Sequence, residues 1–188
     1  MVQYTHKAEQ GTTNKERQKT MKKLMIAGMA VAIGTMATGG TMDKATGLLK
    51  GFEGFRPSVY KCDAGKTTIG YGFTSKELIA KGHITEADAT RELKRICEGI
   101  ALNLRKEIGT AKPLTASQEA AVVSFVYNVG WANFKTSKMC RLLKEGKRGA
   151  VVGAEFRKWV YVTKGGKRVV SKGLANRRHK EAMTFLVG

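Results

Sequence analysis

A run of 19 residues without an ionisable side chain, residues 24–42, constrains this 188-residue chain more than any other feature. A bilayer core is crossed by a helix of about 20 residues, so the run is long enough to span a membrane. It holds only eight large apolar residues among four Gly, four Ala and three Thr. We therefore expect a signal-anchor that holds weakly, preceded by a cytoplasmic basic tail (residues 1–23) and followed by one domain (residues 43–188).

The residues before the run predict its orientation. Six basic and two acidic residues lie in 1–23, a bias that keeps the N-terminus in the cytoplasm and exports the domain. Met21-Lys22-Lys23 has the character of an export-signal start, so Met1 and Met21 are both candidate initiation sites. The alternatives to a retained anchor are cleavage of a signal peptide at Ala37-Thr38-Gly39 and a buried helix of a soluble protein.

Charge and cysteine content limit the functions that the exported domain can have. The chain carries +19, and residues 138–188 alone hold 14 basic and three acidic side chains. We expect a polyanionic partner or surface: nucleic acid, acidic lipid or an anionic cell-wall polymer. Three Cys are too few for a disulfide scaffold, and neither they nor the three His have metal-ligand spacing. No metal and no cofactor are therefore expected.

The periodicity of the domain predicts an α+β fold with a small sheet and a mostly helical lobe. Alternating apolar residues indicate a β-hairpin or three-stranded ribbon within 59–74. Thr115 with Gln118 forms a capping-box pattern before an apolar helix that Gly130 ends. The expected helices span residues 45–52, a segment that starts at Thr85, and residues 116–129, 138–145, 149–160 and 174–187, with a turn at 164–167.

Glu53 is the candidate for acid catalysis. It follows the first expected helix between two phenylalanines, and an apolar environment favours the protonated carboxyl that a general acid needs. Glycosidic cleavage also needs a second group that activates water, attacks, or stabilises the transition state. Cys62, Asp63 and Thr68 lie in the hairpin that would face Glu53 across a cleft. A solvated helix end is the ordinary alternative for such a glutamate.

The segment 51–74, GFEGFRPSVYKCDAGKTTIGYGFT, resembles the active-site segment of phage-type lysozymes, the endolysins of lambda-like phages and prophages. That family places Glu, then Asp or Cys after eight intervening residues, then Thr after five more, and Glu53, Cys62 and Thr68 match this register. The resemblance covers residues 45–188. Further segments resemble family signatures in the family's order: residues 124–130, 133–134, 156–159, 165–167 and 173–178.

The resemblance implies a lysozyme-like fold and a muramidase that hydrolyses the β-1,4 bond between N-acetylmuramic acid and N-acetylglucosamine in peptidoglycan. It implies Glu53 as the proton donor, Cys62 in the place of the second carboxylate, and Thr68 as a group that positions water or the sugar. Arg177 matches a family arginine that pairs with the catalytic glutamate. The residues implied in substrate binding are Tyr71, Asn128 and Phe134.

The second catalytic group stays open between Cys62 and Asp63. Neighbours on a strand point to opposite faces, so only one of the two faces the cleft. The family register favours Cys62, whose thiol acts only as thiolate, a form that nearby lysines favour. The family usually has His where this chain has Phe73. Whether the reaction inverts or retains depends on the distance between Glu53 and its partner.

The resemblance and the weak anchor together imply a monomeric enzyme held at the bacterial inner membrane through residues 24–42 and then released to the periplasm for host cell lysis. Some relatives with such an anchor are caged by a disulfide between the catalytic Cys and a Cys in the anchor. This chain has no Cys before Cys62, so only Cys97 and Cys140 are available to pair with it. The apolar surroundings of both favour plain core residues.

Two other functions are weighed against hydrolysis. A non-enzymatic binder of nucleic acid or anionic membrane fits the charge, but the chain has no recognised nucleic-acid motif, so no specific nucleic acid is expected. A lytic transglycosylase uses one carboxylate and makes an anhydro sugar, whereas the pair Cys62 and Thr68 favours hydrolysis. A peptidoglycan amidase or endopeptidase is disfavoured because the chain shows no zinc or Cys/His set.

Overall fold

The computed structural model describes residues 38–62, 65–109 and 111–188. The expected basic tail, residues 24–37 of the expected anchor, and Asp63 lie outside these ranges. No helix within the described ranges is both long and apolar enough to cross a bilayer.

Helix α2 (Thr38–Glu53) opens the described part and ends at the candidate catalytic residue. Met42, Ala45 and Leu49 recur at helical spacing and are buried, which gives α2 an apolar stripe against the core. Because this stripe starts inside the segment expected to be an anchor, the helix begins well before the expected residue 45. Gly54, with a φ of 66°, turns the chain out of the helix.

An antiparallel hairpin follows α2, as expected within residues 59–74. Its strands are β1 (Arg56–Lys61) and β2 (Thr67–Gly70). Ile69, Tyr71 and Phe73 alternate along this segment, and all three are buried. A short helix that the periodicity did not predict, α3 (Lys76–Ala80), comes next.

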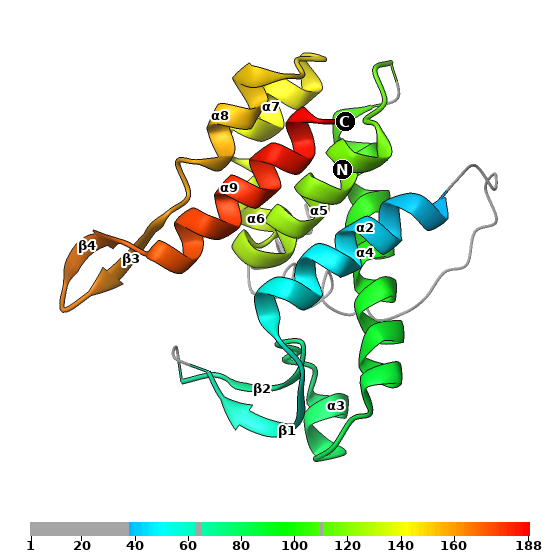
Figure 1. The fold of residues 1–188 in the computed structure, drawn as a ribbon, viewed down its shortest axis with the longest axis vertical. Coiled ribbons are helices and arrows are strands. Elements are labelled where there is room, and N and C mark those ends of the chain that lie inside the picture. Colours follow the sequence, from blue (N-terminus) through cyan, green and yellow to red (C-terminus); the bar gives the residue numbers. More distant parts are fainter. Residues whose placement is uncertain (1–37, 63–64, 110) are drawn as a thin grey trace, which may run out of the picture. The chain divides into compact units, whose positions relative to one another are not determined.

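Helix α5 (Ala116–Val129) is the centre of the helical lobe (Figure 1). Thr115 and Gln118 form the expected capping box, and Gly130 ends the helix with a φ of 86°. Eight consecutive residues from Glu119 are buried, because three other helices pack around α5. Those helices are α2, α4 (Glu86–Ile108) and α9 (Lys172–Leu186), and the lobe is completed by α6 (Trp131–Lys135), α7 (Lys138–Lys144) and α8 (Ala150–Phe156).

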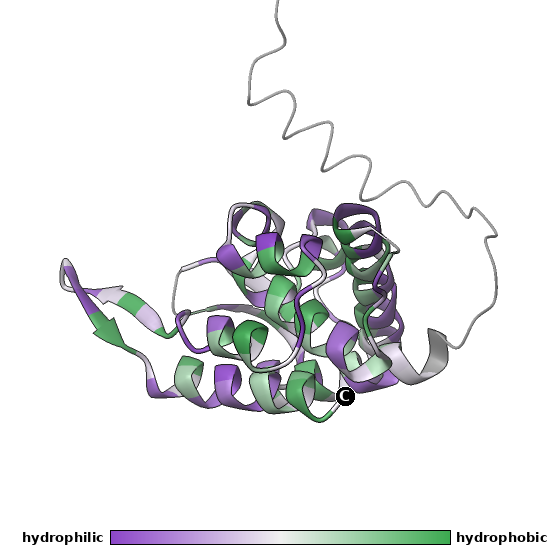
Figure 2. Ribbon diagram, turned by 90° about the horizontal axis from the view of Figure 1, so that it is seen from above, coloured by the Kyte–Doolittle hydropathy of each residue, from purple (hydrophilic) through white to green (hydrophobic). Residues whose placement is uncertain are grey.

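A second hairpin, which the periodicity did not predict, separates α8 from α9. Strands β3 (Tyr161–Lys164) and β4 (Lys167–Val170) pair around Gly165 and Gly166, whose φ angles of 55° and 74° suit a tight hairpin turn. The helix expected over 149–160 stops at Phe156, because β-branched residues on both sides of this turn favour strands. Figures 1 and 2 both show the hairpin projecting from the helices, and every strand residue in it is exposed.

Candidate active site

Glu53 lies where the helical lobe meets the β1–β2 hairpin. It is the last residue of α2, and its side chain is 22% exposed, so the carboxylate is reachable but partly shielded. A Cβ atom placed on Gly72, just after β2, would lie 3.6 Å from Glu53 Oε2. The backbone after β2 therefore passes beside the carboxylate, and the glycine, with a φ of 84°, brings no side chain against it.

Arg177, on α9, holds the other carboxylate oxygen. Its Nη1 lies 2.6 Å from Glu53 Oε1, and its Nη2 donates to the Ser124 carbonyl at 3.1 Å. The guanidinium carbon lies 4.8 Å from the centre of the Phe52 ring. A guanidinium this buried needs such partners, because an unpaired charge is costly away from water. Arg177 therefore fixes the position of Glu53 from the helical lobe.

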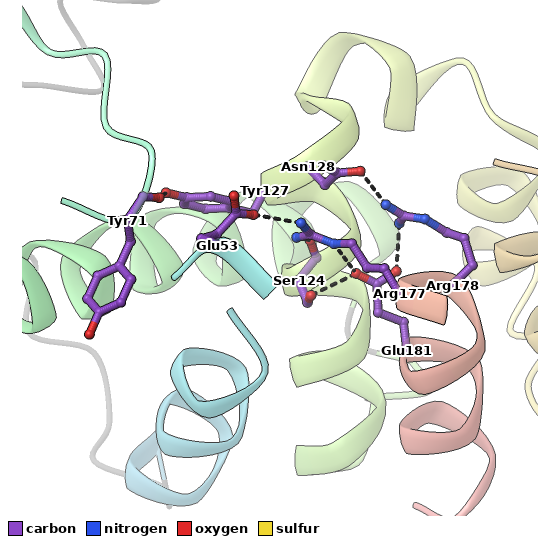
Figure 3. A network of polar contacts seen from close by, with 8 residues as sticks. All are labelled: Glu53, Tyr71, Ser124, Tyr127, Asn128, Arg177, Arg178 and Glu181. Atoms are coloured by element: carbon purple, nitrogen blue, oxygen red, sulfur yellow. Dashed lines mark hydrogen bonds and ion pairs between the residues drawn. The ribbon is translucent and has the colours of Figure 1, made fainter. Parts of the chain in front are cut away.

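Glu181 is the buried anion behind Arg177 (Figure 3). Its Oε1 accepts from Arg177 Nε at 3.1 Å and from Ser124 Oγ at 2.7 Å, and its Oε2 accepts from Arg178 Nη1 at 2.6 Å. Burial raises the pKa of Glu181 against the opposing effect of both guanidinium groups, and burial lowers the pKa of Arg178 to about 10. In their charged forms, the carboxylates of Glu53 and Glu181 balance the two arginines.

Glu181 was not predicted as a site residue, although the sequence of α9 contains a signal for it. Glu181 stands three positions after Arg178 and four positions after Arg177, the spacings at which helical side chains meet. It is also the only acidic residue between Phe156 and the end of the chain. A single carboxylate at this spacing from two arginines indicates an ion-pair cluster.

Tyr127 ties the first hairpin to the helical lobe beside Glu53 (Figure 3). Its hydroxyl donates to the Tyr71 carbonyl at 2.8 Å. Burial, followed by the negative charge of Glu53, raises the pKa of this phenol, so the hydroxyl remains protonated through the neutral range. The hydrogen bond keeps the backbone that carries Gly72 next to α5.

Cys62 and Thr68 lie in the first hairpin. Cys62 follows β1 and is half-buried, and its backbone N–H donates to the Lys66 carbonyl at 2.9 Å. Thr68, on β2, is 4% exposed, and its hydroxyl donates to the Tyr60 carbonyl at 3.3 Å. That hydroxyl still has lone pairs with which it can accept. Asp63 lies outside the described residues, so the choice between Cys62 and Asp63 stays open.

Two of the three residues implied in substrate binding are buried in the structure. Phe134 has no exposed surface, because α6 turns its ring into the core against Trp131, with 5.5 Å between the ring centres. Tyr71 is 2% exposed, and its ring points away from Glu53 (Figure 3), where its hydroxyl lies 2.9 Å from a Glu86 oxygen. Neither ring has surface to offer a glycan. Asn128 is exposed near the end of α5, and its Oδ1 accepts from Arg178.

All three cysteines are free thiols. Cys97, on α4, is buried, and burial raises the pKa of its thiol to about 12. Cys140, on α7, is also buried, and burial raises its pKa as well. A thiol that stays protonated reacts slowly in disulfide exchange. The two buried cysteines therefore pack as core residues and leave Cys62 as the accessible thiol.

Thiol titration of the native chain tests this difference. At pH 8 we expect one rapidly reacting equivalent, from Cys62, because Cys97 and Cys140 are buried and protonated. The absorbance released from an aromatic disulfide reagent measures it. Cys62→Ser should remove the rapid equivalent, and denaturation should expose the other two thiols. A second rapid thiol in the native chain would contradict the burial of the other two.

Removal of the Glu181 charge tests the buried cluster. Glu181→Gln should lower the free energy of unfolding by about 3 kcal/mol, because two buried arginines lose their shared carboxylate. Urea denaturation followed by circular dichroism measures the change. Glu98→Gln, an exposed position on α4, is the matched control and should shift stability by less than about 0.5 kcal/mol. Equal stability of the two variants would show that Glu181 carries no important charge.

The chain is similar to known proteins in sequence and fold. A profile of the phage lysozyme family matches residues 50–181. The chain is 35% identical over 143 residues to an endolysin of Acyrthosiphon pisum secondary endosymbiont phage 1, a match that covers 76% of this chain and 95% of the relative. It is 34% identical over 161 residues to a SAR-endolysin of Bacteriophage PS119, a match that covers 85% of this chain and 91% of the relative. The solved endolysin from Escherichia coli O157:H7 phage FAHEc1 has a TM-score of 0.67 at 30% identity, over 81% of this chain and 95% of that chain.

These similarities agree with the fold. The solved endolysin confirms the expected α+β class with a lysozyme-like arrangement of helices and small antiparallel sheets. The profile spans Glu53, the first hairpin and the cluster of Arg177, Arg178 and Glu181. The chain therefore belongs to the phage lysozyme family of glycoside hydrolases.

Proposed function

We propose that this chain is an endolysin that hydrolyses the β-1,4 bond between N-acetylmuramic acid and N-acetylglucosamine in peptidoglycan, with Glu53 as the proton donor. The observation that carries the proposal is the asymmetry of the carboxylate: Arg177 binds Oε1 at 2.6 Å, and Oε2 lies toward the backbone at Gly72. One oxygen is anchored, and the other is left to carry and deliver a proton. Membership in a hydrolase family argues against a purely non-enzymatic basic binder.

In the proposed reaction, Glu53 gives its proton to the glycosidic oxygen as the bond from that oxygen to the anomeric carbon breaks. The carboxylate that remains keeps its contact with Arg177, so negative charge develops beside a cation that is already in position. The carboxylate of Glu181 and the Ser124 carbonyl hold this cation from the other side. The site therefore needs little reorganisation when the proton leaves.

The second catalytic group is proposed to come from the first hairpin. Cys62 occupies the register position that the family fills with Asp or Cys, and Asp63 is the alternative. As a thiolate or a carboxylate, either group activates water or opposes the positive charge that develops on the sugar. Thr68, whose hydroxyl already donates to a carbonyl, would accept a hydrogen bond from that water. The exposed Asn128 would contact the sugar from the end of α5.

Clearing of permeabilised Gram-negative cells by the purified chain tests these roles. Glu53→Gln keeps the size of the side chain but has no acidic proton, so we expect the clearing rate to fall at least about 100-fold. Glu98→Gln is the control for loss of one carboxylate and should clear normally. Loss of clearing in Cys62→Ser with retention in Asp63→Asn supports Cys62, and the reverse pattern assigns Asp63. Normal clearing by Glu53→Gln would overturn the proposal.

A lytic transglycosylase is the second candidate, since it cleaves the same bond. Hydrolysis adds water and leaves a reducing N-acetylmuramic acid, whereas transglycosylation leaves an anhydro sugar. Mass spectrometry of the muropeptides released in the clearing assay separates the two products. We propose hydrolysis because the register supplies a second group, Cys62 or Asp63, in addition to Glu53.

We propose that residues 24–42 hold the chain at the bacterial inner membrane until it is released to the periplasm, where it acts as a monomer. The support is the uncharged run after a basic tail, together with the similarity to a SAR-endolysin. The small residues of the run make its insertion weak, which is the property that release requires.

A stronger anchor should prevent release. Gly28→Leu combined with Gly34→Leu adds apolar surface to the run, so we expect the full chain to stay in the membrane fraction after alkaline extraction and to delay lysis. Gly28→Ala combined with Gly34→Ala is the control and should leave the chain releasable. Fractionation of expressing cells measures the outcome. Periplasmic release of the leucine variant at the original rate would contradict an anchor in this segment.

A further inference from the structure

The second hairpin exposes apolar side chains that no described element covers. Tyr161, Val162, Val169 and Val170 are between 38% and 57% exposed. A two-stranded hairpin with neither face covered is marginally stable in water, and grouped exposed apolar residues mark a binding surface. The hairpin therefore has the features of a surface that receives a partner.

One face of this hairpin borders a hollow that is lined by two arginines. Tyr161 and Arg168 lie on the same face, and the guanidinium carbon is 4.1 Å from the centre of the tyrosine ring. Together with Arg157 and Lys158 they line a hollow of about 580 Å³, which we call the basic hollow. Lys158 is paired with Glu155 at 2.8 Å, whereas Arg157 and Arg168 have no acidic partner within the described ranges.

The charge around the basic hollow selects an anion. Residues 156–180 contain nine basic and no acidic side chains. An arginine guanidinium binds a carboxylate through two parallel hydrogen bonds, and a stacked guanidinium keeps its edge available for them. Tyr161 adds an apolar wall beside the cations. The hollow thus suits a carboxylate attached to a partly apolar group.

The basic hollow is connected through the base of the hairpin to α9, the helix that carries Arg177. Ser171 closes the base of the hairpin through a 2.8 Å bond from its N–H to the Val160 carbonyl, and α9 begins directly after it. Arg177 follows six residues later, about 9 Å further along the helix axis. A second hollow of about 510 Å³ is lined by Arg157, Val160, Ala175 and His179, so Arg157 joins the basic hollow to α9.

The second hollow lies on the side of α9 that faces away from Arg177. Ala175 and His179 are each two residues from Arg177, or roughly 200° around the helix, so they occupy the opposite side of α9. A glycan bound at Glu53 would lie on the side of α9 that Arg177 faces. A group that reaches the other side must branch from that glycan.

We propose that the basic hollow binds the carboxylates of the peptide branches of peptidoglycan while Glu53 acts on the glycan that bears them, an inference that rests on the proposed function. The branches carry free carboxylates and small apolar side chains, which match Arg157, Arg168 and Tyr161. A lipid surface fits less well. The hairpin tip carries Lys164 and Lys167, and the apolar residues lie at its base, so the tip cannot enter a bilayer core.

Reducing-end release from purified sacculi tests the inference. Two substrates are compared: native sacculi, and sacculi whose carboxyl groups have been converted to neutral amides with carbodiimide and glycinamide. Arg157→Gln combined with Arg168→Gln should lower kcat/KM on native sacculi about tenfold through KM, with kcat unchanged. Amidation of the sacculi should lower the kcat/KM of the unchanged chain by a similar factor. It should not lower the kcat/KM of the double variant any further, because both changes remove the same contact.

The controls distinguish loss of the basic hollow from a general loss of positive charge. They also distinguish failure of this inference from failure of the proposed function. Lys106→Gln combined with Lys147→Gln removes the same charge at exposed positions away from the basic hollow and should behave like the unchanged chain on both substrates. An unchanged kcat/KM in the arginine variant, or an equal further loss on amidated sacculi, would overturn the inference. Loss of binding to anionic phospholipid vesicles with normal sacculus kinetics would assign the hairpin to lipid instead. Cleavage by Glu53→Gln at the original rate would refute the proposed function itself.

Discussion

The buried charge cluster on α9 is the interaction on which the site depends. Arg177 must leave water to reach Glu53, and an arginine does so only when other groups compensate for its lost hydration. Glu181 and the Ser124 carbonyl supply this compensation, each at 3.1 Å from a guanidinium nitrogen, and the Ser124 hydroxyl donates to Glu181 at 2.7 Å. The catalytic carboxylate is therefore held by a cation that is itself held rigidly, so its position is a property of the α5–α9 packing rather than of α2 alone.

The two hairpins differ in how they are attached to the rest of the protein. The first is fastened to the helical lobe by buried aromatic residues and by the Tyr127 hydroxyl, which brings its backbone against the carboxylate of Glu53. The second has no such cover within the described residues and is strongly basic. Rigid attachment suits a group that takes part in chemistry, whereas an open, charged surface suits recognition of a substrate that is large and variable.

Much of the fold follows from local sequence signals. The helix over 116–129 was predicted with its observed bounds, because a capping box and a glycine mark its two ends independently of packing. The helix expected over 149–160 was too long, because apolar periodicity cannot distinguish a helix end from a following short strand. The burial of Tyr71 and Phe134 was not predicted, for a different reason. Their motifs show that aromatic residues are needed, but not whether the rings face a substrate or the core.

By itself, the sequence determined the class of the fold, the resemblance to lysozymes, and Glu53 as the candidate acid, because residue type and spacing along the chain carry that information. Only the tertiary structure decided that Glu181 supports Arg177, that Phe134 is buried, and that Arg157 and Arg168 share one hollow. These relations join side chains from different elements or depend on which way a helix faces. Burial and the cost of an unpaired charge determine them, and both arise only when the elements pack together.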